Sequence, residues 1–486
     1  MNRTQFPYWI AQVAVTLAVL WSSGDPLFWD TIQLAGKQAD WYFQNDFRHF
    51  FLPERIDSGH PPVFGMYLAG WWSLFGRSLL VSHLAMLPIV WLLVAGVWRV
   101  SRHWLDDDAL WGLLIVFCDP VLLGQLLLVS PDLWLVAAFA WTLAGILEGR
   151  NDWKMMGVIG LCLISTRGMM TSVALLLFDL VGKYHFSFSS AKKILLGYLP
   201  GAALGAGFLV AHALHTGWIG YHPDSPWAGS FKTVDAGGLA KNVVLYVWRW
   251  LDFGRVGLWL ILLGLGVQNW RNRRQNRIAL PPANTKPPRF SKPWRFKSES
   301  WANLREPLLL LVLLIAFSLP TFLRYVGLNG HRYLLPCLLT FGWCFVAVVR
   351  VFPAKKWLLP LGLAWLGSGN LWIYPAHISQ QWDGSLAYRG HFTARAAALE
   401  FLAQEEIPLH QVGTVFPEIG PRDWRELNGD TTGMVRFAVG KQPYVLVMTT
   451  MNDFPDELHE RGFGDLIFEC CHWRICARIH AAEPKQ

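Results

Sequence analysis

A carboxylate and several cations occur where they could act on one substrate at a membrane surface. Asp30 lies in "WDTIQLA" (29–35), directly after a tryptophan and at the start of a stretch with helical periodicity. Arg167 interrupts an apolar run, and His331 and Arg332 begin another. A carboxylate can accept the proton of an attacking hydroxyl, and fixed cations can stabilise charge on a departing anion. These residues therefore predict a base beside an anion-binding site.

Further polar residues around the same outer loops are weaker candidates. Asp132 follows a Ser-Pro at a helix start, where it could either cap the helix or belong to a polar site. Aromatic residues of the loop 215–238 could stack on a ligand or form an interfacial belt. The candidates beyond Asp30, Arg167, His331 and Arg332 are His60, Asp132, Asp25, Asp57, Trp218 and Tyr221. The charges of Lys37, Asp40, Asp46 and Glu54 are expected to be solvated.

The elements that position these residues are membrane-spanning helices. The chain has 486 residues, of which 53% are hydrophobic and only 16% charged, with a mean hydropathy of +0.29. A soluble domain carries about 25% charged residues. Apolar runs occur near 7–23, 79–98, 109–129, 133–147, 155–181, 194–214, 256–270, 307–323, 333–349 and 357–375. Because lipid leaves no other partner for the backbone, these runs predict helices, with about eleven crossings.

One run is predicted to be two helices. The run 155–181 contains Ser165-Thr166-Arg167-Gly168, and an arginine at mid-bilayer is costly. Two shorter helices that meet near an aqueous face remove that cost. The first helix, which Arg3 precedes without a small-residue cleavage site, is expected to be an uncleaved anchor.

Lysine and arginine set the expected orientation. About half of the 42 basic residues lie in one set of loops, which includes the proline-rich segment 271–305, so this set is predicted to be cytoplasmic. Residues 24–60, 215–253 and those after about 376 then face the periplasm or the outside. The formal net charge of +8 mainly reflects this topology, and a nucleic-acid partner is not expected. We expect a multi-pass protein of a cell membrane, in a bacterium the inner membrane.

The composition divides the chain into two predicted domains. Residues 1–375 form the transmembrane domain, with a first outer loop at 24–78 and a basic cytoplasmic linker at 271–305. Residues 376–486 resemble a soluble domain in composition. In it, 393–406 has helical periodicity, and "QVGTVF", "PYVLVMTT" and "LIFECCHWRICARIH" predict strands. The second domain is therefore expected to be a small extracytoplasmic α/β domain.

Three of the seven cysteines lie in this outer domain: Cys470, Cys471 and Cys476. In an oxidising compartment their separation favours a disulfide across a tight hairpin, and Cys471 with Cys476 is the simplest pair. Zinc is the alternative, with His472 nearby, but the spacing typical of structural zinc is missing.

Several motifs in order resemble one family. These are "WDTIQLA", "SGHPPVFGMYLAGWWSLFG" (58–76), "SPDLWLVAAF" (130–139), "STRGMM" (165–170) and "HRYLLP" (331–336). Their order resembles polyprenyl-phosphate-dependent glycosyltransferases of the GT-C fold, the branch that includes protein O-mannosyltransferases and lipid A aminoarabinose transferases. The resemblance covers about residues 7–350. It implies an inverting transfer of a sugar from a polyprenyl-phosphate donor, embedded in the lipid bilayer, to an extracytoplasmic lipid, glycan or protein.

The resemblance assigns roles and also has departures. It implies that Asp30 is the base, that Arg167, His331 and Arg332 bind the phosphate, and that His60 and Asp132 shape the pocket. The family's acidic pair is usually Asp-Glu, but here Thr31 follows Asp30. The usual Lys before Pro-Pro is His60. Asp25 is the rival base, although it lies close to the helix end.

Two other functions are consistent with the composition. A transporter or flippase of lipid-linked glycans predicts ionisable residues along a path within the helices, whereas here they gather at the outer face. A scaffold for other envelope enzymes is the third alternative. No Asp-x-Asp with metal spacing occurs in 29–72, so no cofactor or metal is expected to be essential, and a divalent metal is left open.

Overall fold

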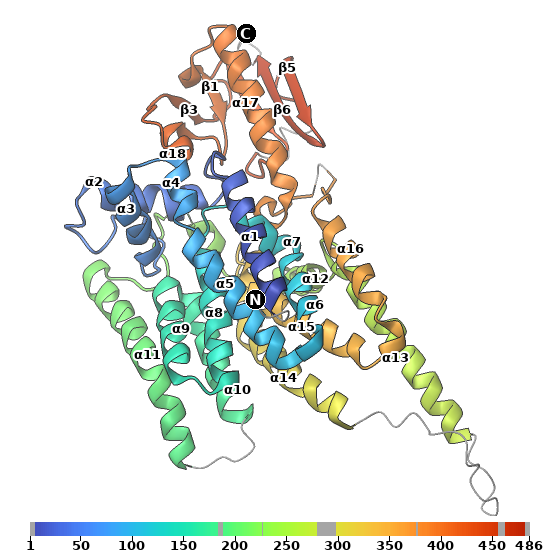
Figure 1. The fold of residues 1–486 in the computed structure, drawn as a ribbon. Coiled ribbons are helices and arrows are strands. Elements are labelled where there is room, and N and C mark those ends of the chain that lie inside the picture. Colours follow the sequence, from blue (N-terminus) through green and yellow to red (C-terminus); the bar gives the residue numbers. More distant parts are fainter. Residues whose placement is uncertain are drawn as a thin grey trace, which may run out of the picture.

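The structure, a computed structural model, has a helical body capped at one end by a small domain with a β-sheet (Figure 1). The described residues are 5–182, 188–225, 227–278, 298–375, 378–454 and 462–481. Most of the predicted linker 271–305 lies outside them, so that prediction stays untested.

Each apolar run of the sequence is helical in the structure. The helices of the body are α1 (Phe6–Trp21), α2 (Gln38–Gln44), α3 (Val63–Phe75), α4 (Leu79–Leu84), α5 (Leu87–Leu105), α6 (Ala109–Phe117), α7 (Pro120–Leu126), α8 (Pro131–Glu148), α9 (Asn151–Ile164), α10 (Thr166–Gly182), α11 (Phe188–Thr216), α12 (Ala236–Leu251), α13 (Arg255–Ile278), α14 (Ser298–Arg324), α15 (Leu335–Arg350) and α16 (Leu358–Gly369). Short helical turns between them are η2 (Ile32–Lys37, a π-helix), η3 (Asp106–Asp108), η4 (Ala228–Phe231), η5 (His331–Leu334) and η6 (Pro353–Lys355).

The chain is a polytopic α-helical membrane protein. Among the described residues, five helical segments are long and apolar enough to cross a bilayer: Leu79–Phe117, Pro131–Glu148, Ala191–Thr216, Leu304–Arg324 and His331–Arg350. The pair α12 and α13, bent by 80° between its two helices, passes the same test when it is counted as one span. The predicted eleven crossings also counted runs that form shorter helices, such as α1, α9, α10 and α16. The sequence interpretation of 215–253 as a loop missed α12, whose 16 residues are helical.

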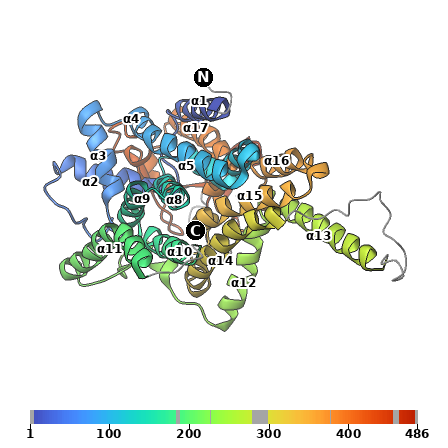
Figure 2. The same cartoon turned by 60° about the horizontal axis from the view of Figure 1, so that its bottom comes forward.

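Small residues allow the central helices to approach closely. Gly96 of α5 faces Ala140 of α8, where an added Cβ would lie 2.8 Å from the Ala140 Cβ. Gly157 of α9 lies against the Thr142 backbone of α8. A Cβ added at Gly157 would lie 2.7 Å from the Thr142 amide nitrogen. Close approach at small residues is how helices gain packing energy in lipid, where burial from water contributes little. Seen along the helices, α8 and α9 lie side by side next to α5 (Figure 2).

The cap is an α/β domain. Its elements are η7 (Trp382–Gly384), η8 (Leu386–Tyr388), α17 (Arg389–Gln404), η9 (Leu409–Gln411), β1 (Val412–Thr414), β2 (Gly420–Pro421), α18 (Asp423–Glu426), β3 (Gly433–Arg436), β4 (Tyr444–Met448), β5 (Asp465–His472) and β6 (Ile475–Ala481). The strand order is β2-β3-β1-β4-β6-β5. β1 is parallel to β3 and β4, whereas β6 is antiparallel to β4 and β5. The predicted strands correspond to β1, β4, β5 and β6; β2 and β3 were missed.

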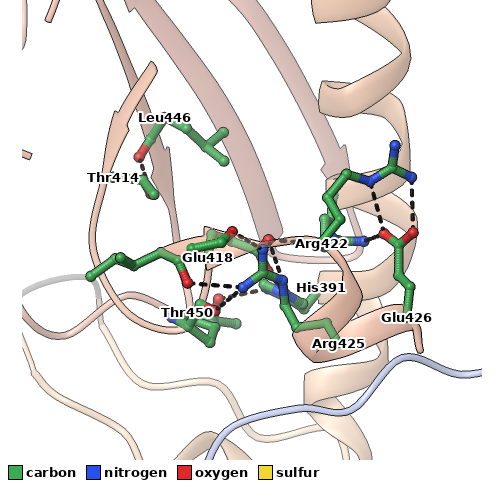
Figure 3. A network of polar contacts seen from close by, with 12 residues as sticks. His391, Thr414, Glu418, Arg422, Arg425, Glu426, Leu446 and Thr450 are labelled. Atoms are coloured by element: carbon green, nitrogen blue, oxygen red, sulfur yellow. Dashed lines mark hydrogen bonds and ion pairs between the residues drawn. The ribbon is translucent and has the colours of Figure 1, made fainter. Parts of the chain in front are cut away.

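A buried ionic network holds the loop before α18 in place. Glu418 Oε1 lies 3.1 Å from His391 Nε2 in the polar network that Figure 3 shows. The Glu418 carboxylate accepts from Arg395 Nε at 2.7 Å, and Arg425 Nε lies 3.3 Å from it. Burial alone would raise the pKa of Glu418, but Arg395 and Arg425 hold that pKa well below its usual range. A buried carboxylate with this many partners fixes the local conformation.

The predicted cysteine pair lies at the end of the β5–β6 hairpin. Cys471 and Cys476 are register partners in the ladder, and their sulfurs are bonded at 1.98 Å. Cys470 is unbonded. We expect a non-reduced digest of the protein to yield a peptide cross-linked through Cys471 and Cys476. Mass spectrometry that found free thiols at all three positions would contradict the pairing.

Candidate active site

A cavity of about 410 Å³ opens where η2, α10, α14 and η5 come together. One end is charged and is lined by Asp30, Arg167, Arg332 and Asp383. Another part of the lining is mostly apolar and includes Met170, Ala174, Leu314, Phe317 and Phe322, with Thr171, Ser318 and Thr321 on the same helices. The apolar wall belongs to α10 and α14, which lie side by side in both views (Figures 1 and 2). The cavity thus combines a charged part with an apolar part, as an amphiphilic ligand does.

A tight turn before η2 directs Asp30 into this cavity. Trp29 has a left-handed backbone, with φ of 55°. The Phe28 N–H donates to the Thr31 hydroxyl at 2.9 Å, and that hydroxyl donates to the Phe28 carbonyl oxygen at 2.7 Å. Thr31 is buried by this ring of contacts, 3% exposed. The residue after Asp30 therefore faces the turn and not the cavity.

Arg332 connects three carboxylates at the charged end. Its guanidinium donates to Asp30, lies 3.3 Å from the Asp383 carboxylate and 3.7 Å from that of Asp132. The side chain of Asp30 is 18% exposed, against 2% for Asp132 and 3% for Asp383. Asp30 is thus the carboxylate of this group that a substrate can most readily reach.

Arg167 lies where the long apolar run breaks. Ser165 has extended backbone, and its hydroxyl accepts from the Gly168 N–H at 3.2 Å, which caps the start of α10. The predicted division into two helices is therefore confirmed. Arg167 donates to Asp132 at 2.7 Å, and its guanidinium carbon lies 4.5 Å from the Tyr333 ring centroid. Both arginines of the site contact this ring, since Arg332 lies 5.1 Å from it.

Asp132 is a member of the ionic cluster and not a helix cap. The N-cap of α8 is Ser130, whose hydroxyl accepts from the Asp132 N–H at 3.2 Å. The Asp132 carboxylate instead faces Arg167 and Arg332. Of the two alternatives for Asp132, the structure places it in the polar site.

His60 lines the cavity, but as a neutral group. Its Nδ1 lies 3.3 Å from the Thr166 hydroxyl. Burial lowers the pKa of His60 to about 4, and the charge of Arg167 acts in the same direction. At neutral pH this imidazole can accept or donate hydrogen bonds but brings no positive charge to an anion.

His331 does not line the cavity, although its neighbour Arg332 does. The His331 Nε2 lies 2.8 Å from the buried Asp252 carboxylate, and the ring packs on Phe253 at 4.5 Å. The same Asp252 carboxylate accepts from the Tyr374 hydroxyl. These contacts anchor η5, so His331 positions the turn that carries Arg332 and is not placed to bind a ligand.

The weaker candidates lie around the cavity without lining it. Asp25 pairs with Arg389 at the start of α17. Asp57 lies 2.9 Å from His212 Nε2 and accepts from the Gly59 N–H at 2.8 Å. The Trp218 ring packs on His212 at 4.5 Å. Tyr221 stacks at 4.8 Å on Phe231, and Phe231 itself is a lining residue, as is Trp227.

The sequence interpretation missed Asp383. It lies in η7, after the last apolar run and beyond the motifs, in a stretch with no recognisable signal other than "QQWDG". Burial raises the pKa of Asp383 to about 6; Arg332 opposes this, and the negative charges of Asp30 and Asp132 add to it. The site thus contains a third carboxylate, contributed by the segment that leads into the outer domain.

Potential metal ligands gather elsewhere. Within the described ranges, the side chains of Glu469, Cys471 and Cys476 are close enough together to hold a metal ion. The two cysteines, however, are bonded to each other as a disulfide. At the cavity, the guanidinium of Arg332 already occupies the centre of the three carboxylates. The charged end is therefore built as an arginine–carboxylate cluster.

Comparison with known proteins finds similarity in fold. No family model matches the chain, and no curated protein matches it. The structure is similar to that of ArnT from Cupriavidus metallidurans. The crystal structure of ArnT bound to undecaprenyl phosphate has a TM-score of 0.49 at 13% identity, over 82% of this chain and 72% of that chain. The apo state has a TM-score of 0.48 at 13% identity, over 98% and 99%.

Proposed function

We propose that the protein is a glycosyltransferase that moves a sugar from a polyprenyl-phosphate donor to an acceptor at the outer surface of a membrane, in a bacterium the periplasmic face of the inner membrane. The observation that carries this proposal is the cavity whose lining joins a cluster of charged residues to an apolar wall. The arginines at its charged end fit the phosphate, and the wall of α10 and α14 fits the start of the isoprenoid chain. The motif order in the sequence supports the same class.

The proposed reaction is a single displacement. The donor phosphate binds to Arg167 and Arg332, which releases Asp30 from its ion pair with Arg332. Asp30 then accepts the proton of the acceptor hydroxyl while the acceptor oxygen bonds to the anomeric carbon. The bond from that carbon to the phosphate oxygen breaks, and the electron pair stays on the phosphate, which the arginines stabilise. One displacement inverts the anomeric configuration.

Tyr333 supports the arginines in this scheme. Its ring lies against both guanidinium groups, and its hydroxyl accepts from Arg332 at 3.2 Å. Because the Tyr333 ring packs on both cations, it limits the rotamers of the two arginines. Their guanidinium N–H donors are therefore preorganised for phosphate oxygens. His60, being neutral, is suited to hydrogen-bond a sugar or acceptor hydroxyl.

The proposal is tested with the full-length protein in liposomes that contain a panel of polyprenyl-phosphate-linked hexoses and aminopentoses. We expect mass spectrometry to detect free polyprenyl phosphate when an extract of envelope lipids and glycans is added as acceptor. Movement of an intact lipid-linked sugar between leaflets, without cleavage, would favour the transporter alternative. Absence of both activities across the panel, with a folded protein, would contradict the proposal.

A further inference from the structure

The third carboxylate of the cavity has a fixed place that the reaction scheme above does not use. The Asp383 carbonyl oxygen accepts from Gln125 Nε2 of α7 at 2.8 Å. Two residues earlier, the Gln381 side chain accepts from the His331 N–H at 2.8 Å. These two hydrogen bonds attach η7 to α7 on one side and to η5 on the other. They thereby hold the Asp383 carboxylate beside Arg332, whose Nη1 lies 3.3 Å from Asp383 Oδ2.

The charge balance at this end is unfavourable for an anionic ligand. Arg167 and Arg332 face Asp30, Asp132 and Asp383, and Arg332 contacts all three. A phosphate that enters as a further anion must displace carboxylates from Arg332. Asp132 keeps a second arginine partner in Arg167, whereas among the described residues the ion pair of the Asp383 carboxylate is with Arg332. If Asp383 takes up a proton, Arg332 is released and one negative charge is removed.

We infer that Asp383 is a residue of the phosphate site, that it competes with the donor phosphate for Arg332, and that it must carry a proton for the phosphate to bind. The inference rests on the proposed function and adds a residue from outside the motif-bearing part of the chain. In the protonated state the carboxyl group of Asp383 can donate a hydrogen bond to a phosphate oxygen.

The groups around Asp383 are consistent with a proton on this carboxyl. Arg332 faces it from η5, Asp30 from the turn before η2, Asp132 from α8 and Tyr388 from η8. The His331 ring lies near the following glycine, and α7 contributes no charged side chain. With a pKa of about 6, Asp383 is mostly ionised at pH 8 and about half protonated at pH 6.

The test is the pH dependence of binding of a polyprenyl phosphate methyl ester. A phosphodiester is the right probe because a phosphate monoester has its own second pKa near 6. If only the protonated form binds, the competent fraction falls between pH 6 and pH 8, and the wild-type Kd rises by up to about 50-fold. Asp383→Asn should bind with a Kd that is nearly constant over this range, because the amide cannot ionise.

Two variants control the result. Asp383→Glu keeps a titratable carboxyl and should keep a pH-dependent Kd. Asp453→Asn removes an outer-domain aspartate that does not line the cavity, and should behave as wild type. Thermal melting of each full-length variant in detergent establishes that it is folded. Inorganic phosphate at millimolar concentration should not displace the probe, because it leaves the apolar wall unfilled.

The outcomes separate this inference from the proposed function. An unchanged pH dependence in Asp383→Asn, or weaker binding by that variant at every pH, would overturn the role of Asp383 and leave the proposed function standing. Absence of binding to the wild type at any pH would overturn both. Full displacement by millimolar inorganic phosphate would show that the apolar wall does not contribute to binding, and would overturn the assignment of the site to a lipid phosphate.

Discussion

Replacement of Asp30 by asparagine is expected to lower turnover by about 10²–10⁴-fold, the usual contribution of a general base. Asparagine keeps the size of the side chain but cannot accept the proton of the acceptor. Donor affinity should fall little or even rise, because the substitution also removes a carboxylate that competes for Arg332. Release of polyprenyl phosphate, measured at saturating donor and acceptor, gives the turnover, and binding of the phosphodiester probe gives the affinity.

Asp25→Asn is the matched control for this prediction. Asp25 is the rival base in the sequence, but it pairs with Arg389 and does not line the cavity. We expect the Asp25 variant to keep most of its turnover. Full transfer by Asp30→Asn together with loss of transfer in Asp25→Asn would show that the base was wrongly assigned. Full transfer by both variants would show that neither carboxylate of the first outer loop is the base.

Arg332→Ala is expected to weaken donor binding as well as turnover. A hydrogen bond to a charged group contributes about 1.5–3 kcal/mol, so the donor Kd should rise by roughly 10- to 150-fold. Loss of the guanidinium also leaves Asp30, Asp132 and Asp383 without their shared partner, which costs stability. Arg332→Lys keeps the positive charge but not the planar fork, and should have an intermediate Kd with a melting temperature closer to wild type.

Arg478→Ala serves as the control for the arginine series. Arg478 pairs with Glu469 on the outer hairpin and is half-exposed, so its loss should not change donor affinity. The prediction on Arg332 would be contradicted by a lysine variant that is folded and reduced in turnover but unchanged in donor Kd. In that case the guanidinium would act only on the transition state.

The sequence indicated the helices and the charged loop well, because both depend on local patterns. Apolar runs specify helices in lipid, and the broken run at Ser165 was identifiable from the cost of a buried arginine. Asp30, Arg167 and Arg332 do converge on one cavity. Adjacent residues were harder to separate: His331 and Arg332 are neighbours in sequence, but a short helical turn directs one to Asp252 and the other to the cavity.

What the sequence could not indicate depends on contacts between distant segments. Asp383 is brought to Asp30 by hydrogen bonds from α7 and η5, and no local pattern encodes them. Lys37 and Asp40 looked like solvated charges, yet Lys37 Nζ lies 3.6 Å from the centroid of the Trp424 ring, and Asp40 accepts from Arg77 at 2.9 Å. The role of Thr31 was also invisible, because its hydroxyl closes a turn on the backbone.

The contact between α18 and the first outer loop has a consequence for how the molecule can be divided. Arg77 bridges Asp40 and Asp423, the Leu27 N–H donates to the Arg425 carbonyl oxygen, and Lys37 lies on Trp424. The outer domain therefore holds both ends of the π-helix that follows Asp30. A chain cut after residue 375 would lose this clamp together with Asp383. A chimera that takes its outer domain from another such protein would also need that protein's residues equivalent to 25–77. These residues and the outer domain contact each other directly, so they have to match.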